Sequence, residues 1–293
     1  MEVLSNPELV EQDLPAIPFL IRPIIPIGGI VLMYGKRGVG KTQLGLTIAH
    51  DVIAGSKFGN HYQAYAGRVA YLQVDTPILI QKARVNLLKD KLGLNPPNLL
   101  WLLNDQPINI FNELDEDAQW IRDIEAFTPD LLIVDTLRKV HRLDEDSSET
   151  PSLVYGAFKS IAGPQAAVMF IHHEKKSSEF TRQDEMFRGS GDWMDGADTA
   201  INLIKEYKRK GLRLEFPKTR TCDDQPPLHL QRDEDTLLLS ASDPKEALMM
   251  DMMMKGMPKR QIIDLVTDRH KWGEQAWSTA TAYRRLDGYH GAE

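Results

Sequence analysis

Residues 35–42 read Gly35-Lys36-Arg37-Gly38-Val39-Gly40-Lys41-Thr42, which has the GxxxxGKT spacing of a phosphate-binding loop. Glycines let the backbone N–H groups of such a loop fold around phosphate oxygens, and the helix that follows adds its positive N-terminal end. Lys41 is expected to reach the terminal phosphates, and Thr42 to offer its hydroxyl to Mg²⁺. An apolar run precedes the stretch and a helical pattern follows it, as this chemistry requires. All eight residues are therefore predicted to bind a nucleotide.

The predicted metal site needs a carboxylate at the end of a neighbouring strand. The apolar run at 131–134 ends in Asp135. Taken alone, an apolar strand that ends in aspartate is common and more often structural. Because nucleotide-bound Mg²⁺ is usually held by such a carboxylate together with the loop hydroxyl, the pair Thr42 and Asp135 is predicted to bind the metal.

The fold class follows from the hydrophobic pattern. Nearly continuous Val/Ile/Leu runs predict strands buried on both faces of a parallel sheet, at 30–34, 69–74, 99–103, 131–134 and 167–171. Segments with helical spacing lie between them, at 42–54, 78–94, 116–127 and 152–161. After Asp198 the pattern alternates, which predicts antiparallel strands at one edge of the sheet, at 212–216, 228–231 and 236–239. The chain is thus predicted to have an α/β core.

A second, smaller domain is predicted at the C-terminus. From Asp243 the pattern is helical again, with expected helices at 247–254, 258–268 and 278–286. The predicted domains are therefore 1–242 and 243–293. Residues 243–293 hold eight Lys/Arg and eight Asp/Glu, although the stretch 255–285 is locally basic.

Composition excludes several classes of protein. The 293 residues are 42% hydrophobic and 26% charged, so the chain can bury a normal core, and its net charge of −7 argues against a wholly basic coat for nucleic acid. The most apolar segment, 15–35, is interrupted by four prolines and Arg22, which excludes a membrane span there. No secretory signal is visible, and one cysteine, Cys222, excludes an internal disulfide. A cytoplasmic location is predicted.

Further motifs follow in a characteristic order. They are Pro26-Ile27-Gly28-Gly29, Asp135-Thr136-Leu137-Arg138 with His141 and Leu143-Asp144-Glu145, Phe170-Ile171-His172-His173, and Arg188-Gly189-Ser190-Gly191 through Ala197-Asp198. With the phosphate-binding loop, they resemble the RecA/DnaB class of P-loop ATPases over roughly residues 15–240, and within it the small RepA-type plasmid replicative helicases and their mobile-element relatives. The resemblance implies a RecA-like core that binds ATP and Mg²⁺, forms a ring of six subunits and acts on DNA.

The resemblance also implies a residue that polarises the attacking water. The family has a glutamate at the end of the second strand, where this chain has Asp75. An aspartate is one methylene shorter, so a slower or impaired ATPase is expected. Glu145 is a substitute to test, although a solvated loop residue is its ordinary interpretation.

Two further catalytic assignments rest on the resemblance. Lys218 and Arg220 match a KxR finger that completes the site of the adjacent subunit, which requires an oligomer. Surface charge is the competing interpretation of this tripeptide. His172 matches the polar sensor at the end of a strand; adjacent strand residues point to opposite faces, so at most one of His172 and His173 can face the nucleotide. Two histidines with structural roles are the alternative.

A basic loop is the first predicted contact with DNA. Residues 174–190 contain Lys175, Lys176, Arg182 and Arg188 among polar residues, as tracking of a single strand requires. In the resembling family, the corresponding loop lines a central channel. A solvated charged loop is the competing interpretation.

The C-terminal helices are the second predicted contact. Their pattern resembles a helix-turn-helix or winged-helix module, with Ser278 or Thr279 as the cap of the last helix. Its outward residues Thr281, Arg284 and Arg285 would meet duplex phosphates or base edges. Subunit or partner contacts are the alternative role of such a module.

These features lead to one leading hypothesis and three alternatives. The leading hypothesis is a replicative-type DNA helicase of a plasmid, phage or other mobile element. A DNA-dependent ATPase that loads, recombines or regulates without unwinding is the first alternative. The second is an ATP-gated DNA-binding regulator with negligible hydrolysis. A small-molecule kinase is disfavoured because no arginine-rich lid is evident in the sequence.

Overall fold

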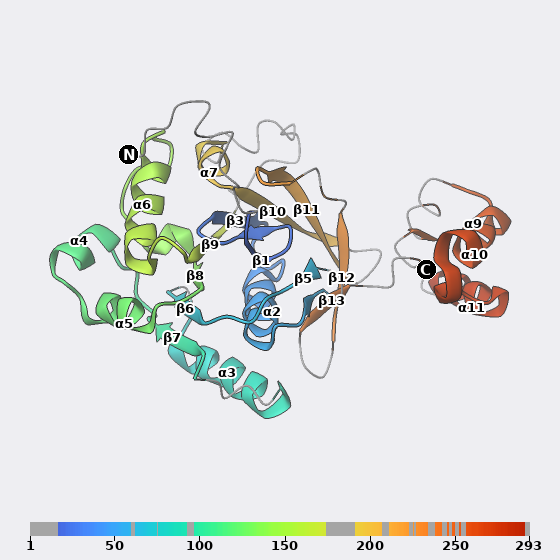
Figure 1. Cartoon of the computed structure of the whole chain (residues 1–293), viewed down its shortest axis with the longest axis horizontal. Helices are drawn as coiled ribbons and strands as arrows, with labels where there is room; N and C mark the ends of the chain where they lie inside the picture. Colours follow the sequence, from blue (N-terminus) through green and yellow to red (C-terminus); the bar gives the residue numbers. More distant parts are fainter. Residues whose placement is uncertain are drawn as a thin grey trace, which may run out of the picture.

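A nine-stranded sheet with helices on both faces forms the centre of the protein (Figure 1). The computed structural model describes residues 17–59, 62–74, 76–92, 97–173, 191–206, 211–222, 227–233, 238–241 and 256–290, together with residues 225, 245, 248, 249 and 252. The strand order is β13-β12-β11-β10-β3-β9-β8-β6-β7. This arrangement confirms the prediction of an α/β fold.

The parallel part of the sheet contains all five predicted strands: β3 (Ile30–Gly35), β6 (Val69–Gln73), β7 (Leu99–Leu103), β8 (Leu131–Asp135) and β9 (Ala167–His173). Because they are parallel, their carboxyl ends share one edge of the sheet, called here the carboxyl edge. The register pairs Gly35 of β3 with His173 of β9, and Asp135 of β8 with Ile171 of β9. The end of the phosphate-binding strand therefore lies beside the ends of β8 and β9.

A sixth parallel strand, β10 (Thr199–Glu206), was not predicted. Its sequence, TAINLIKE, mixes polar and apolar residues and therefore lacks the continuous apolar run of the other parallel strands. The strand pairs with β3 in parallel and with β11 (Gly211–Thr219) in the antiparallel direction. The predicted antiparallel edge is confirmed, with β12 (Leu228–Arg232) and β13 (Leu239–Ala241) following β11. The last strand was wrongly predicted at 236–239: it begins at Leu239, and residues 236–237 lie outside the described part.

The helices between the strands are α2 (Lys41–Ala54), α3 (Ile78–Leu92), α5 (Gln119–Phe127) and α6 (Thr150–Ala162). The predicted helix start at Glu116 was wrong, because Asp117 adopts a φ of 51°, outside the helical region, and separates α5 from an unpredicted helix, α4 (Ile110–Asp115). A 3₁₀ turn, η1 (Leu137–Lys139), and a short helix, α7 (Gly191–Gly196), complete this part. Two small ribbons pair β1 (Phe19–Ile21) with β2 (Ile25–Pro26), and β4 (Lys57–Phe58) with β5 (Tyr62–Gln63).

Alternate residues of each strand enter two separate hydrophobic cores. Val31 and Met33 of β3 pack with α2 on one face, whereas Leu32 and Tyr34 pack with α5, α6 and α7 on the other. The faces are called here the α2 face and the α6 face. The alternation decides toward which helix each polar residue at the carboxyl edge is directed.

The C-terminal part consists of α9 (Lys259–Thr267), α10 (Arg269–Trp272), the 3₁₀ turn η4 (Gly273–Gln275) and α11 (Thr279–His290). These helices lie beyond the β12/β13 edge of the sheet (Figure 1) and have a hydrophobic cluster of their own that includes Ile262, Val266 and Ala282. Two of the predicted helices are present as α9 and α11. Most of the predicted helix at 247–254 lies outside the described residues, and α10 was not predicted. The domain boundary near residue 242 stays a prediction.

No helix among the described residues combines the length and the apolar character needed to cross a membrane.

Candidate nucleotide-binding site

The phosphate-binding loop connects the last residue of β3 to the first residue of α2. Gly38 and Gly40 have φ values of 76° and 112°, which residues with a Cβ rarely adopt. At Gly35 the reason for glycine is close approach, because a Cβ there would lie 2.5 Å from the carbonyl oxygen of Leu203 on β10. The glycines of the motif are thus required by the backbone path.

Lys41 is buried inside this loop, with 4% of its surface exposed. Its Nζ donates hydrogen bonds to the carbonyl oxygens of Gly35 at 2.7 Å and Lys36 at 3.0 Å. The α2 N-terminus receives no side-chain cap from Gly40, and no acidic residue stands in its first turn. An ammonium group and an uncapped helix N-terminus therefore converge on one small loop, and this combination fits a polyphosphate.

Asp135 ends β8 with 2% of its surface exposed, on the α2 face. Its Oδ2 accepts hydrogen bonds from the Tyr71 hydroxyl at 3.2 Å and from Gln73 Nε2 at 3.3 Å. Burial, together with the charge and hydrogen bond of Asp135, raises the pKa of Tyr71 well above its usual value. Gly45 of α2 makes room for this hydroxyl, since a Cβ there would lie 2.8 Å from it.

Sequence reasoning missed Tyr71 and Gln73 as partners of the carboxylate. A signal for them was present, because two polar side chains at alternate positions of an otherwise apolar strand must share one face. Their hydrogen bonds orient the carboxylate at the carboxyl edge, on the side where α2 begins.

The residues present fit a nucleotide-bound Mg²⁺. The described residues contain no group of three or more His, Cys, Asp or Glu side chains that could bind a metal by themselves. Mg²⁺ does not need one, because it is usually bound by one or two protein oxygens together with phosphates and water. The Thr42 hydroxyl in the first turn of α2 and the Asp135 carboxylate on the same face would hold the ion.

His172 is 6% exposed and lies on the α6 face, where its ring stacks on Trp193 with centroids 6.4 Å apart. Burial, followed by the charges of His173, Lys41, Arg138 and His141, lowers its pKa to about 4. The ring is therefore neutral near pH 7. Its register neighbour on β3 is Tyr34, one residue before the loop begins. The sensor role of His172 stays a prediction. The next residue of β9, His173, follows Met169 and Ile171 in the alternation and so lies on the α2 face.

The predicted water-polarising residue, Asp75, lies outside the described residues, as do Lys175, Lys176, Arg182 and Arg188. Their assignments stay predictions.

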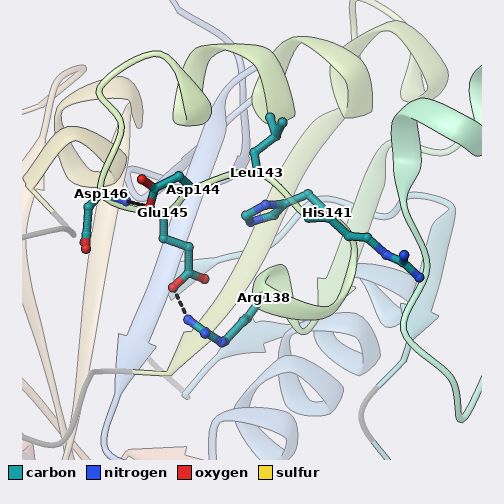
Figure 2. A pocket seen from close by; sticks show the side chains of 7 residues that line it. Arg138, His141, Leu143, Asp144, Glu145 and Asp146 are labelled. Atoms are coloured by element: carbon teal, nitrogen blue, oxygen red, sulfur yellow. Dashed lines mark hydrogen bonds and ion pairs between the residues drawn. The ribbon is translucent and has the colours of Figure 1, made fainter.

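Glu145, the substitute for Asp75, lines a pocket of about 390 Å³ beyond η1 (Figure 2). Its Oε2 forms an ion pair with Arg138 Nη1, whereas its buried Oε1 has no hydrogen-bond partner among the described residues. Figure 2 shows the two side chains directed toward each other. Glu145 is thus a paired, largely buried residue and not the solvated loop residue of the ordinary interpretation.

Lys218 and Arg220 meet at the C-terminal end of α7. Lys218 Nζ donates to the carbonyl oxygens of Met194 at 3.0 Å and Asp195 at 2.7 Å. Arg220 bonds the Asp195 carbonyl oxygen at 3.2 Å and forms an ion pair with Asp198 at 2.8 Å. Burial, and then the charge of Arg220, lowers the pKa of Lys218. The two predicted finger residues therefore lie close together, and both form hydrogen bonds with residues of their own chain.

Asp198, part of the motif near residues 188–198, connects three strands. Its Oδ2 accepts from the backbone N–H of Ile30 at 2.9 Å, and its backbone N–H donates to the carbonyl of Ile30. Its backbone carbonyl also accepts from the backbone N–H of Arg220. The residue therefore ties the starts of β3 and β10 to the end of β11. Sequence reasoning gave it no role, because its partners are distant in the chain.

At the last helix, Ser278 is confirmed as the cap, because its Oγ accepts a hydrogen bond from the backbone N–H of Thr281 at 3.1 Å. The Thr281 hydroxyl also bonds Ser278 Oγ, and Arg284 is exposed. The side chain of Arg285 lies outside the described part of the chain. Contact of these residues with DNA stays a prediction.

The loop, the uncapped helix and the buried aspartate on a parallel sheet are the features of a P-loop ATPase domain that binds a nucleotide. The AAA domain family model matches residues 4–179, more than half of the sequence, and the chain belongs to this family. No curated protein matches it.

Two solved structures show the same fold. One is the "ATPase Domain of G40P", with a TM-score of 0.52 and 11% sequence identity over 74% of this chain and 85% of that chain. The other is a KaiC-like protein from the hyperthermophilic archaeon Pyrococcus horikoshii OT3, with a TM-score of 0.51 and 13% identity over 76% of this chain and 94% of that one. At these identities, both similarities concern the fold alone.

Proposed function

We propose that the protein is an oligomeric, Mg²⁺-dependent ATPase that moves on DNA, as a replicative-type helicase of a plasmid, phage or other mobile element. Lys41 holds the terminal phosphates, Thr42 and Asp135 hold the metal, and Asp75 orients the attacking water. Lys218 and Arg220 act on the nucleotide of the adjacent subunit in a ring, for which six is the expected number.

The observation that carries this proposal is the position of the two cations. Arg220 and Asp198 lie beside Ile30, the first residue of β3, whereas the phosphate-binding loop follows Gly35, the last. Five residues of strand separate these levels by about 17 Å, which is beyond the reach of an arginine side chain. If Lys218 and Arg220 contact a nucleotide, it must therefore belong to a second copy of the chain. Contacts of this head-to-tail kind form a ring when the rotation between subunits closes.

Mixing two inactive variants tests the shared site. Lys41→Ala removes the phosphate ligand, and Arg220→Ala removes the finger, so each variant alone should release little phosphate. In a 1:1 mixture, about a quarter of the interfaces would join an intact loop to an intact finger, and ATPase activity should return to about that fraction of wild type. A mixture as inactive as its components would contradict the proposal.

The proposed motor activity has a separate test. Displacement of a strand from a forked duplex, with ATP and not with a non-hydrolysable analogue, is the expected result. ATP hydrolysis stimulated by DNA without displacement would favour the loader or recombinase-like alternative. Negligible phosphate release with intact DNA binding would favour the ATP-gated regulator.

The proposed DNA contact of the C-terminal helices is tested by Arg284→Ala. This variant should bind duplex DNA more weakly than wild type, and its affinity should depend less on salt concentration.

A further inference from the structure

Helix α7 contacts both His172 and the two finger cations. Its third residue, Trp193, stacks on His172, whose backbone pairs with β3 one residue before the phosphate-binding loop. The carbonyl oxygens of the next two residues, Met194 and Asp195, accept the hydrogen bonds of the two finger cations. Three consecutive residues of one short helix thus join the two groups.

Trp193 is fully buried and fixes α7 against the α6 face. Its ring lies 5.6 Å from that of His141 and 5.4 Å from that of Tyr155, measured between centroids. The Tyr155 hydroxyl also donates to the backbone carbonyl of Trp193 at 2.8 Å. The side chain and the backbone of one residue thus set the position of this short helix.

Packing alone does not account for a tryptophan at this position. Neither its Nε1 nor the Nδ1 of His172 has a hydrogen-bond partner among the described residues, although both atoms are buried. A buried polar group without a partner is costly, so an apolar side chain of similar size would suit a purely structural role better. The flat indole ring instead provides a surface on which the imidazole of His172 stacks.

The positions of the two finger cations also depend on α7. The last carbonyl groups of a helix lack partners within it and carry partial negative charge, which suits Lys218 and Arg220. Any displacement of α7 therefore moves the acceptors of both cations together, while Asp198 anchors Arg220 from the sheet.

We propose that α7 is a strut between His172 and the two finger cations and that Trp193 is its positioning residue. A change in the position of His172 at the carboxyl edge of one subunit is passed through the indole ring to Met194 and Asp195. It thereby sets where Lys218 and Arg220 stand toward the next subunit. The inference rests on the proposed function of these cations, and it adds a physical route by which one nucleotide site influences the next.

Steady-state kinetics with paired variants test this role in the full-length protein. Trp193→Leu should lower kcat by about tenfold or more, since small misplacements of catalytic groups have effects of this size. The Kd of a fluorescent non-hydrolysable ATP analogue should change less than about twofold, because the phosphate-binding loop is intact. Trp193→Phe, which keeps an aromatic ring against His172, should recover part of the lost kcat. Trp120→Phe, on α5, is the matched control and should behave as wild type.

The double variant Trp193→Leu/Arg220→Ala decides between the possible results. A kcat no lower than that of Arg220→Ala alone would support the strut, because the tryptophan would act through the cations. Losses that multiply would overturn the strut and leave the finger intact. An Arg220→Ala variant with wild-type kcat would overturn the finger role and the strut with it. Should Trp193→Leu not fold, Tyr155→Phe, which removes a single hydrogen bond to α7, takes its place with about a fivefold expected loss and the same non-additivity.

Discussion

The buried His172 makes the stability of the protein depend on pH in a calculable way. Burial and nearby positive groups lower its pKa from 6.5 to about 4, so the folded chain keeps the ring neutral while the unfolded chain takes up a proton below pH 6.5. Because the unfolded state binds more protons in this window, the free energy of unfolding must decrease as the pH falls from 6.5 toward 4. The contribution of this one ring between pH 7 and pH 5 is about 2 kcal/mol. Below pH 4 both states are protonated, and the contribution stays constant.

The assay is urea unfolding of wild type and His172→Gln at pH 7, 6 and 5. The variant removes the titrating group, so the difference in unfolding free energy between the two proteins should change by about 2 kcal/mol across this range, in the variant's favour at low pH. Parallel curves for wild type and His172→Gln would refute the assignment of a neutral, buried imidazole.

Two further predictions concern the backbone around the site. Gly35→Ala should destabilise the fold by about 2 kcal/mol or more, because the added Cβ would lie 2.5 Å from the Leu203 carbonyl oxygen. Gly156→Ala is the control: this glycine lies in α6 with open space around it, so the alanine should stabilise the fold by up to about 1 kcal/mol. Equal melting temperatures for the two variants would contradict the close approach at Gly35. Asp198→Ala should cost about 2–3 kcal/mol in urea unfolding, because the Ile30 N–H and Arg220 lose their acceptor; a cost no larger than that of a surface substitution would show that the three-strand link is unimportant.

The parts of the fold that could be predicted from the sequence are those that local pattern encodes. The phosphate-binding loop and the strand ending in Asp135 carry their signal within a few residues, and both are found where they were predicted. Strand β10 and Trp193 could not be predicted, because their roles come from partners far away in the chain. The ion pair of Arg220 with Asp198 likewise joins residues that only the sheet topology brings together.

Calorimetric titration with Mg·ATP tests the central claim, that the loop from Gly35 to Thr42 binds the phosphates of a nucleoside triphosphate. Wild type should bind with measurable heat. Lys41→Ala, which removes the buried ammonium group, should weaken the affinity at least about a hundredfold. Lys218→Ala, at the opposite end of β3, should leave the affinity of an isolated subunit unchanged. Binding by Lys41→Ala as tight as by wild type, or no binding by wild type, would contradict the account.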